Sequence, residues 1–242
     1  MRIDGERGFV LHRYPYGETS LVVEAFTYAF GRVGLVARGV RRAGKAFAGA
    51  HLRPFQPLLL SWSGRGELGT LVRAEAPEGA IELEGNAVWW AFYINELVLR
   101  LLHRHEAHAD LYVAYDEALR ALAASGCREE VLRIFEKRLL AGLGYGLALR
   151  RDARSGEPVE SQTDYRYLVD EGPIAGGDGR EGLKVKGATL IALAQEAFTD
   201  GDQLREAKVL LRGALAVLLG DKPLHTRSLL RSIQARVSTT PP

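Results

Sequence analysis

The sequence predicts an α+β protein in which a five-stranded barrel of the OB type is followed by an α-helical domain with a small β-hairpin insertion. Three observations lead to this prediction. The first 80 residues contain short apolar runs separated by glycine and proline turns, the apolar period becomes helical after Pro77, and residues 150–182 interrupt the helical pattern. The predicted divisions are residues 1–80, 81–149, 150–182 and 183–242, and the second and fourth are two parts of one helical domain.

Five runs rich in Val, Leu, Phe and Tyr predict the strands of the N-terminal domain. Turn residues separate the runs, and a long link joins the third run to the fourth. This pattern suits a small closed barrel, with a small β-sandwich as the alternative. The predicted strands are residues 8–14, 20–26, 32–38, 57–62 and 68–74.

Apolar residues at helical spacing fill most of the remaining chain. Within the insertion, residues 165–169 are predicted to form a strand, and a turn at residues 171–173 leads into a second strand at Ile174. The predicted helices are residues 86–103, 111–122, 131–139, 187–198, 202–219 and 226–237.

Positive charge is concentrated in one part of a nearly neutral chain. The 242 residues include 32 Lys and Arg against 30 Asp and Glu, yet residues 25–66 contain no acidic residue. A stretch of one sign inside a balanced protein is typical of a polyanion-binding surface, although a solvated basic loop would have the same composition. The candidate phosphate-binding residues are Arg32, Arg38, Arg41, Arg42, Lys45, Arg53 and Arg65.

Aromatic residues near this stretch are candidates for stacking on bases. For any single ring, packing in the barrel core is the competing interpretation, and it is the one that the pattern favours. The rings concerned are Tyr14, Tyr16, Phe47, Phe55 and Trp62.

The sequence offers no basis for catalysis or for a metal site. It contains no nucleophile elbow, phosphate-binding P-loop or zinc-protease motif. His103, His105 and His108 match no zinc spacing and are interpreted as a solvated helix end. Cys127, the single cysteine, lies at a predicted helix start without an identified base. We therefore expect neither an enzyme nor a cofactor, and one cysteine without an apolar leader or membrane span fits a cytoplasmic protein.

Cations beside apolar residues on two predicted helices suggest a second binding site. Arg133 lies near Phe135 on one helix, and Lys208 and Arg212 lie on another. An apolar groove bordered by cations could hold the terminal carboxylate and last aromatic side chain of a peptide. Ordinary amphipathic helices explain the same pattern and are favoured by it.

An ordered set of short motifs extends almost from end to end of the chain. These are FVLH at residue 9, GETSL at 17, GRV at 31, LVARG at 35, LRPFQPLLL at 52, GRGE at 64, YINEL at 93, LGYG at 143, SGEPV at 155, GDKPL at 220 and TR at 226. Taken together, these motifs resemble the bacterial DNA-repair and recombination mediator family RecO, in its proteobacterial form.

The resemblance implies a protein that binds single- and double-stranded DNA and anneals complementary strands. It also implies binding of the C-terminal tail of the single-strand-binding protein SSB, and cooperation with RecR in loading RecA on single-stranded DNA in the RecF pathway. Arg133, Phe135, Lys208 and Arg212 would then belong to the SSB-tail site. Some relatives have a four-cysteine zinc site in the insertion, whereas residues 150–182 contain no cysteine, so we expect packing and hydrogen bonds to hold this insertion.

Charge and fold alone leave two other functions open. An OB-fold protein that binds structured RNA or the ribosome would have the same basic surface. A DNA-processing enzyme is the third class, but the clustered acidic residues expected for metal-dependent cleavage are missing from the sequence.

Overall fold

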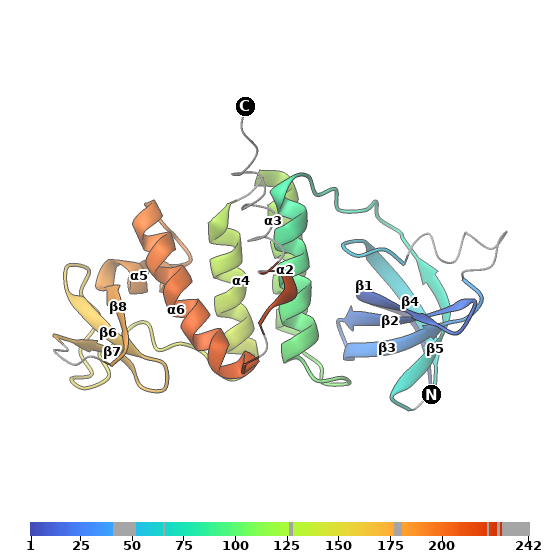
Figure 1. Ribbon diagram of the computed structural model, residues 1–242, viewed down its shortest axis with the longest axis horizontal. Coiled ribbons are helices and arrows are strands. Elements are labelled where there is room, and N and C mark those ends of the chain that lie inside the picture. Colours follow the sequence, from blue (N-terminus) through green and yellow to red (C-terminus); the bar gives the residue numbers. More distant parts are fainter. Residues whose placement is uncertain are drawn as a thin grey trace. The chain divides into compact units, whose positions relative to one another are not determined.

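A computed structural model describes residues 1–40, 52–64, 66–125, 128–176, 181–221, 223–226 and 228. The described chain forms two compact units (Figure 1). One contains residues 1–127 and the segment from 223, and the other contains residues 128–222. This division groups two helices with the barrel, so it does not follow the change of period near residue 80. The predicted helix at residues 226–237 lies almost entirely outside the described residues.

The first unit begins with a closed barrel in the strand order β1-β2-β3-β5-β4, which is an OB-like arrangement. All neighbouring pairs are antiparallel except β3 and β5, which are parallel. The α+β prediction with a five-stranded barrel is confirmed. The strands are β1 (Arg2–Tyr16), β2 (Ser20–Thr27), β3 (Gly31–Ala37), β4 (Pro57–Ser63) and β5 (Leu68–Glu75).

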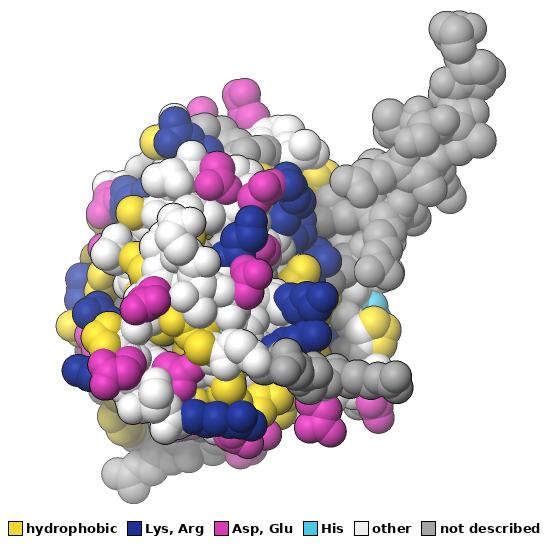
Figure 2. Space-filling view, turned by 90° about the vertical axis from the view of Figure 1, so that its left-hand side faces the viewer, with side chains coloured by type: hydrophobic (Ala, Val, Ile, Leu, Met, Phe, Trp, Pro, Cys, Tyr) yellow, Lys and Arg dark blue, Asp and Glu magenta, His cyan; other side chains and the backbone are white. Residues whose placement is uncertain are grey.

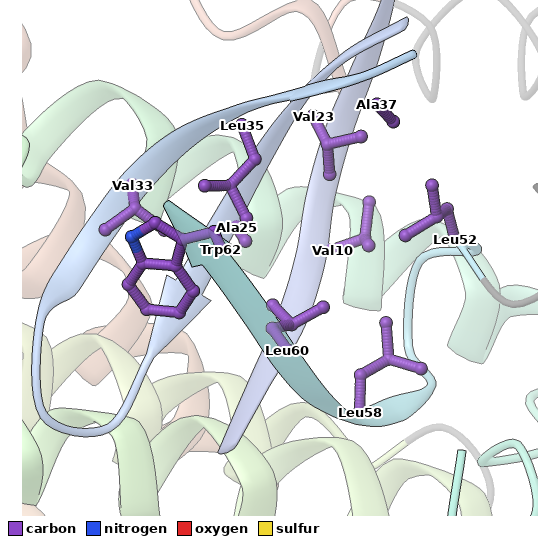
Figure 3. Close-up of a cluster of buried hydrophobic side chains, with 10 residues drawn as sticks. All are labelled: Val10, Val23, Ala25, Val33, Leu35, Ala37, Leu52, Leu58, Leu60 and Trp62. Carbon is purple, nitrogen blue, oxygen red and sulfur yellow. The ribbon is translucent and has the colours of Figure 1, made fainter. Parts of the chain in front are cut away.

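Alternating apolar side chains fill the barrel (Figure 3). Val33, Leu35 and Ala37 are every second residue of β3, and each is about 1% exposed. Because successive side chains of a strand point to opposite faces, this spacing directs all three inward. Leu58, Leu60 and Trp62 do the same on β4.

Two helices, α2 (Asn86–Leu101) and α3 (Ala109–Ser125), belong to the same unit. Phe9 and Phe26 project from β1 and β2 towards α3, where their ring centroids lie 5.1 and 5.7 Å from that of Tyr115. The buried Tyr115 hydroxyl donates to Asn95 of α2, whose amide donates to the Leu11 carbonyl of β1 at 3.0 Å. Aromatic packing and this polar link fix the helices against the barrel.

The second unit combines three helices with a three-stranded antiparallel sheet in the order β7-β6-β8. The predicted hairpin is therefore incomplete, because a third strand follows the range assigned to the insertion. The third strand ends at Lys186, and α5 begins at the next residue, Gly187, without a turn between them. The elements are α4 (Glu129–Gly142), β6 (Asp164–Leu168), β7 (Gly172–Ala175), β8 (Leu183–Lys186), α5 (Gly187–Gln195) and α6 (Gly201–Leu219).

The insertion is held by hydrogen bonds to one buried carboxylate. Asp152 accepts from the backbone N–H groups of Arg154 and Ser155 at 2.9 and 2.8 Å, and from the Ser155 hydroxyl at 3.1 Å. Its second oxygen accepts from the backbone N–H of Ala175, at the end of β7, at 2.6 Å. Asp152 thereby connects the turn at residues 153–156 to the sheet.

Candidate nucleic-acid interface

Two exposed arginines flank the loop between β3 and β4. Arg38 follows the last residue of β3, and Arg53 precedes β4. Both are exposed, as phosphate contact requires. Four other predicted phosphate-binding residues, Arg41, Arg42, Lys45 and Arg65, lie outside the part of the chain that the structure describes.

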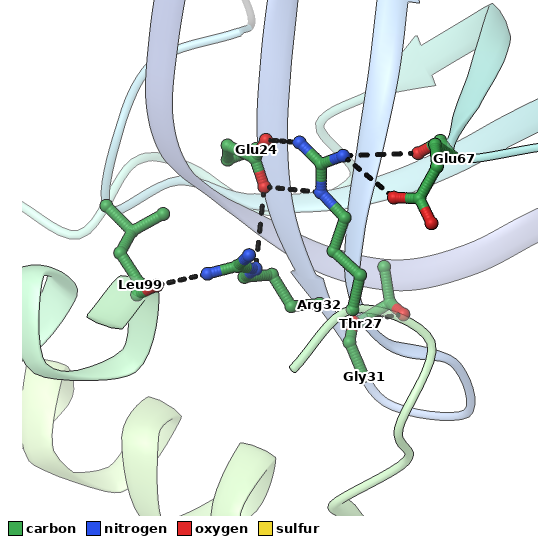
Figure 4. Close-up of polar contacts among 7 residues, drawn as sticks. Glu24, Thr27, Gly31, Arg32, Glu67 and Leu99 are labelled. Atoms are coloured by element: carbon green, nitrogen blue, oxygen red, sulfur yellow. Dashed lines mark hydrogen bonds and ion pairs between the residues drawn. The ribbon is translucent and has the colours of Figure 1, made fainter. Parts of the chain in front are cut away.

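Arg32 has a different environment, because its charge is compensated inside the unit (Figure 4). Its Nε lies 3.6 Å from a carboxylate oxygen of Glu24, and its Nη1 donates to the Leu99 carbonyl of α2. The side chain is only 20% exposed. Arg32 therefore joins β3 to β2 and α2, a role that its place in the acid-free stretch does not reveal.

Arg104 completes this ion-pair network. Its guanidinium binds the other oxygen of Glu24, and Nη1 also lies 3.4 Å from the Glu67 carboxylate. The hydrogen bond to Glu24 raises the pKa of Arg104, although burial opposes the shift. One buried carboxylate is thus shared by two arginines, and the cluster of these three side chains keeps a net positive charge.

A groove of about 1120 Å³ lies in the first unit, along β1 and α2. Three aromatic side chains at alternate positions of β1, His12, Tyr14 and Tyr16, form one wall. The ring centroids of His12 and Tyr14 are 4.4 Å apart, and Tyr14 and Tyr16 are 47% and 53% exposed. Large apolar side chains are normally buried, so a run of exposed rings beside a groove indicates a binding surface.

A second wall of the groove is contributed by α2, whose Trp89 and Phe92 belong to its lining. Phe92 is 37% exposed, and its ring is 4.9 Å from that of Phe55. The sequence prediction missed this wall because Trp89 fits the apolar face of a helix equally well. The only sequence signal for the groove was the alternation of His12, Tyr14 and Tyr16. The predicted strand ended at residue 14 and therefore did not include Tyr16.

The groove contains three arginines and two carboxylates, and neighbouring groups already occupy both carboxylates. Glu24 binds Arg32 and Arg104. Glu96 accepts from the backbone N–H groups of His225 and Thr226 at 2.7 and 2.9 Å and from the Thr226 hydroxyl at 2.6 Å. The electrostatics of the groove therefore favour an anionic ligand.

The structure separates the candidate stacking residues into two kinds. Phe55 and Trp62 are 8% and 7% exposed and pack in the interior, whereas Tyr14 and Tyr16 present their rings to solvent. Phe47 lies outside the described residues. Core packing is thus the role of two of the five rings, and two remain accessible to bases.

In the second unit, two of the four predicted peptide-binding residues are buried. Arg133 is 3% exposed and forms a 2.9 Å ion pair with the fully buried Glu136, and Phe135 is 1% exposed. Lys208 is 31% exposed at its side chain and binds Glu129 at 2.6 Å, and Arg212 is exposed one turn further along α6. Burial opposes ionisation of Glu129, but the Lys208 ammonium outweighs it and lowers the pKa of the carboxyl.

The outer face of the insertion is mixed in charge. Figure 2 views the left-hand side of Figure 1, and there Lys and Arg side chains alternate with Asp and Glu side chains among the described residues. A polyanion-binding surface of one sign is therefore not a feature of this face.

The described residues contain no cluster of three or more His, Cys, Asp or Glu side chains that could hold a metal ion. His103, His105 and His108 lie in the connection after α2 rather than on a helix, because α2 ends at Leu101. Cys127 is outside the described part of the chain.

None of the helices in the described ranges is long and apolar enough to cross a membrane.

Comparison with known proteins identifies close relatives over nearly the whole chain. Residues 1–79 match the family model "Recombination protein O N terminal", and residues 83–228 match "Recombination protein O C terminal". A "DNA repair protein RecO" of Nitrosococcus oceani is 47% identical over 235 residues, which cover 97% of this chain and 95% of the relative. Another from Nitrosospira multiformis is 44% identical over 235 residues, covering 96% and 97%.

Proposed function

The chain belongs to the RecO family of DNA repair proteins, and we propose that it holds DNA on the barrel while its helical part receives protein partners. Family membership makes it a recombination mediator and not an enzyme. It also decides against the RNA-binding and DNA-cleaving alternatives.

The DNA-binding part of the proposal is supported by the position of Arg38 and Arg53. Both are exposed and flank one loop of an OB-like barrel, the loop that also contains Arg41, Arg42 and Lys45 in the sequence. Neutralising phosphates releases counterions and reduces repulsion between two strands. We therefore assign residues 1–80 to DNA binding and expect the protein to bring complementary strands together.

The partners are proposed from the family. They are single- and double-stranded DNA, the SSB C-terminal tail and RecR, with RecA loaded on single-stranded DNA as the outcome. Acting on chromosomal DNA would place the protein in the cytoplasm, at the nucleoid.

Replacing both flanking arginines tests the DNA surface. Arg38→Ala/Arg53→Ala should weaken binding to a single-stranded oligonucleotide, and the slope of log K against log salt should fall by about 0.7 for each phosphate that is no longer neutralised. A salt titration by fluorescence anisotropy measures both quantities. Annealing of SSB-coated complementary strands should slow in parallel.

Arg128→Ala/Arg205→Ala is the matched control, because these two exposed arginines lie on the second unit and pair with Glu130 and Asp202. The control should bind DNA with the parent's salt slope. Equal affinity and equal slope for the parent and Arg38→Ala/Arg53→Ala would remove these residues from the DNA surface.

A further inference from the structure

We propose that the aromatic groove along β1 and α2 takes the unpaired bases of a DNA strand, so that this protein distinguishes single strands from duplex. The inference rests on the proposed function, since it assumes that DNA reaches the barrel. It adds a second kind of contact, made to bases rather than phosphates.

The rings are arranged as a platform for stacking. Tyr14 and Tyr16 occupy alternate positions of one strand, so their side chains lie on the same face, and about half of each is exposed. His12 continues the row and already contacts the Tyr14 ring at 4.4 Å. Every base has a flat face that can stack on such rings, so the surface suits a strand of any sequence.

The groove has the size and charge for a chain of nucleotides. Its volume, about 1120 Å³, exceeds the usual ~300–1,000 Å³ of a small-molecule site. Arg100 and Arg104 lie in its lining, while both of its carboxylates are occupied by Arg32, Arg104 and the backbone at His225 and Thr226. The lining thus contains three arginines against two carboxylates, so phosphates on either side of a stacked base would meet a net positive charge.

Duplex DNA cannot use this groove in the same manner. Paired bases are already stacked on one another, and their faces are closed to protein rings except at ends and distortions. The exposed arginines beside the β3–β4 loop can contact phosphates of either form. The groove is thus expected to contribute only to single-strand binding.

The test compares three ligands of equal length: a single-stranded oligonucleotide of mixed sequence, an abasic deoxyribose-phosphate strand, and the duplex. The Tyr14→Ala/Tyr16→Ala variant should bind the single strand at least about tenfold more weakly than the parent. Its affinity for the abasic strand and for the duplex should stay within about twofold of the parent's. Tyr14→Phe/Tyr16→Phe should retain single-strand affinity because the rings remain.

Tyr145→Ala is the matched control, since it removes a tyrosine that is 59% exposed on the second unit. It should leave all three affinities unchanged. Trp89 lines the groove, so single-stranded DNA should quench tryptophan fluorescence in the parent, and Trp89→Phe should remove that part of the signal. Thermal unfolding of each variant verifies that the fold is retained.

Parent-like affinity of Tyr14→Ala/Tyr16→Ala for the single strand would overturn the inference, and so would an equal decrease on all three ligands. Failure of the parent protein to bind any of the three ligands would instead contradict the proposed function. The two failures are thus distinguishable.

Discussion

Glu24 of β2 and Arg104, which lies after α2, form an ion pair between parts of the chain that are 80 residues apart. Glu24 is 6% exposed at its side chain, and Arg32 binds the same carboxylate from β3. Two arginines thus share one carboxylate. Arg32 belongs to the barrel, and Arg104 lies in the connection between α2 and α3. All three residues line the groove, and their contacts connect the barrel to α2 and to the segment after it.

Replacing Glu24 tests how much this ion-pair network contributes to the free energy of unfolding. Glu24→Gln leaves Arg32 and Arg104 without their common counter-charge in a partly buried site, so the free energy of unfolding should fall by about 1–3 kcal/mol. Urea unfolding at pH 7 measures the change. Glu75→Gln, which breaks the exposed pair with Arg73, is the control and should change stability by less than ~0.5 kcal/mol. A similar small change for Glu24→Gln would show that the network is not a stabilising element.

The lowered pKa of Asp152 predicts that the insertion loses stability at low pH. Backbone hydrogen bonds, first from Ser155 and then from Ala175, lower its pKa from 3.8 to about 2. A lowered pKa means that the stabilisation is complete above about 3.8 and disappears as the pH falls through 2. Asp152→Ala should lower the free energy of unfolding at pH 7 by about 1–3 kcal/mol, because three backbone N–H donors lose their charged acceptor.

The pH dependence of the stability difference distinguishes the loss of hydrogen bonds to the Asp152 carboxylate from a general loosening of packing. The stability difference between the parent and Asp152→Ala should shrink between pH 4 and pH 2 as the parent's carboxyl becomes protonated. Asp170→Ala changes an exposed aspartate in the same insertion and should match the parent at every pH. A constant difference for Asp152→Ala over that range would contradict the hydrogen-bonding role of its charge.

The proposed SSB-tail site depends on Lys208 and Arg212, which lie at i and i+4 on α6 and share a face. Each of Lys208→Ala and Arg212→Ala should weaken binding of an acidic C-terminal peptide of SSB several-fold in fluorescence anisotropy, with little effect on DNA. Glu129→Gln should strengthen peptide binding, because Glu129 competes with the peptide carboxylate for the Lys208 ammonium. Unchanged peptide affinity in both alanine variants would remove α6 from the site.

Local patterns predicted most of the secondary structure. The five strands were found within a few residues, apart from the early start of β1, since alternation of apolar residues and glycine turns are local properties. The exception in the insertion is β8, four residues with a single buried side chain, Val185. So short a strand carries little periodic signal and exists because β6 offers its free edge for pairing.

The candidate site could be predicted only in part, because charge patterns do not show which charges are paired. Arg32 and Arg38 look equivalent in the sequence, yet one is bound to Glu24 and the other is exposed. Arg133 similarly fits the border of a peptide groove, but its helix packs so that this position is interior. Pairing and burial depend on residues distant along the chain, such as Glu24 and Arg104.

The sequence by itself determined the order of strands and helices, the barrel that they favour and the place of the excess positive charge. It did so because backbone conformation follows local periodicity and because composition is additive. The tertiary structure alone decided which cations are exposed, which rings face solvent and where a groove lies. These properties arise when β1 and α2, more than 70 residues apart at their starts, are brought together and their side chains either bury one another or leave space between them.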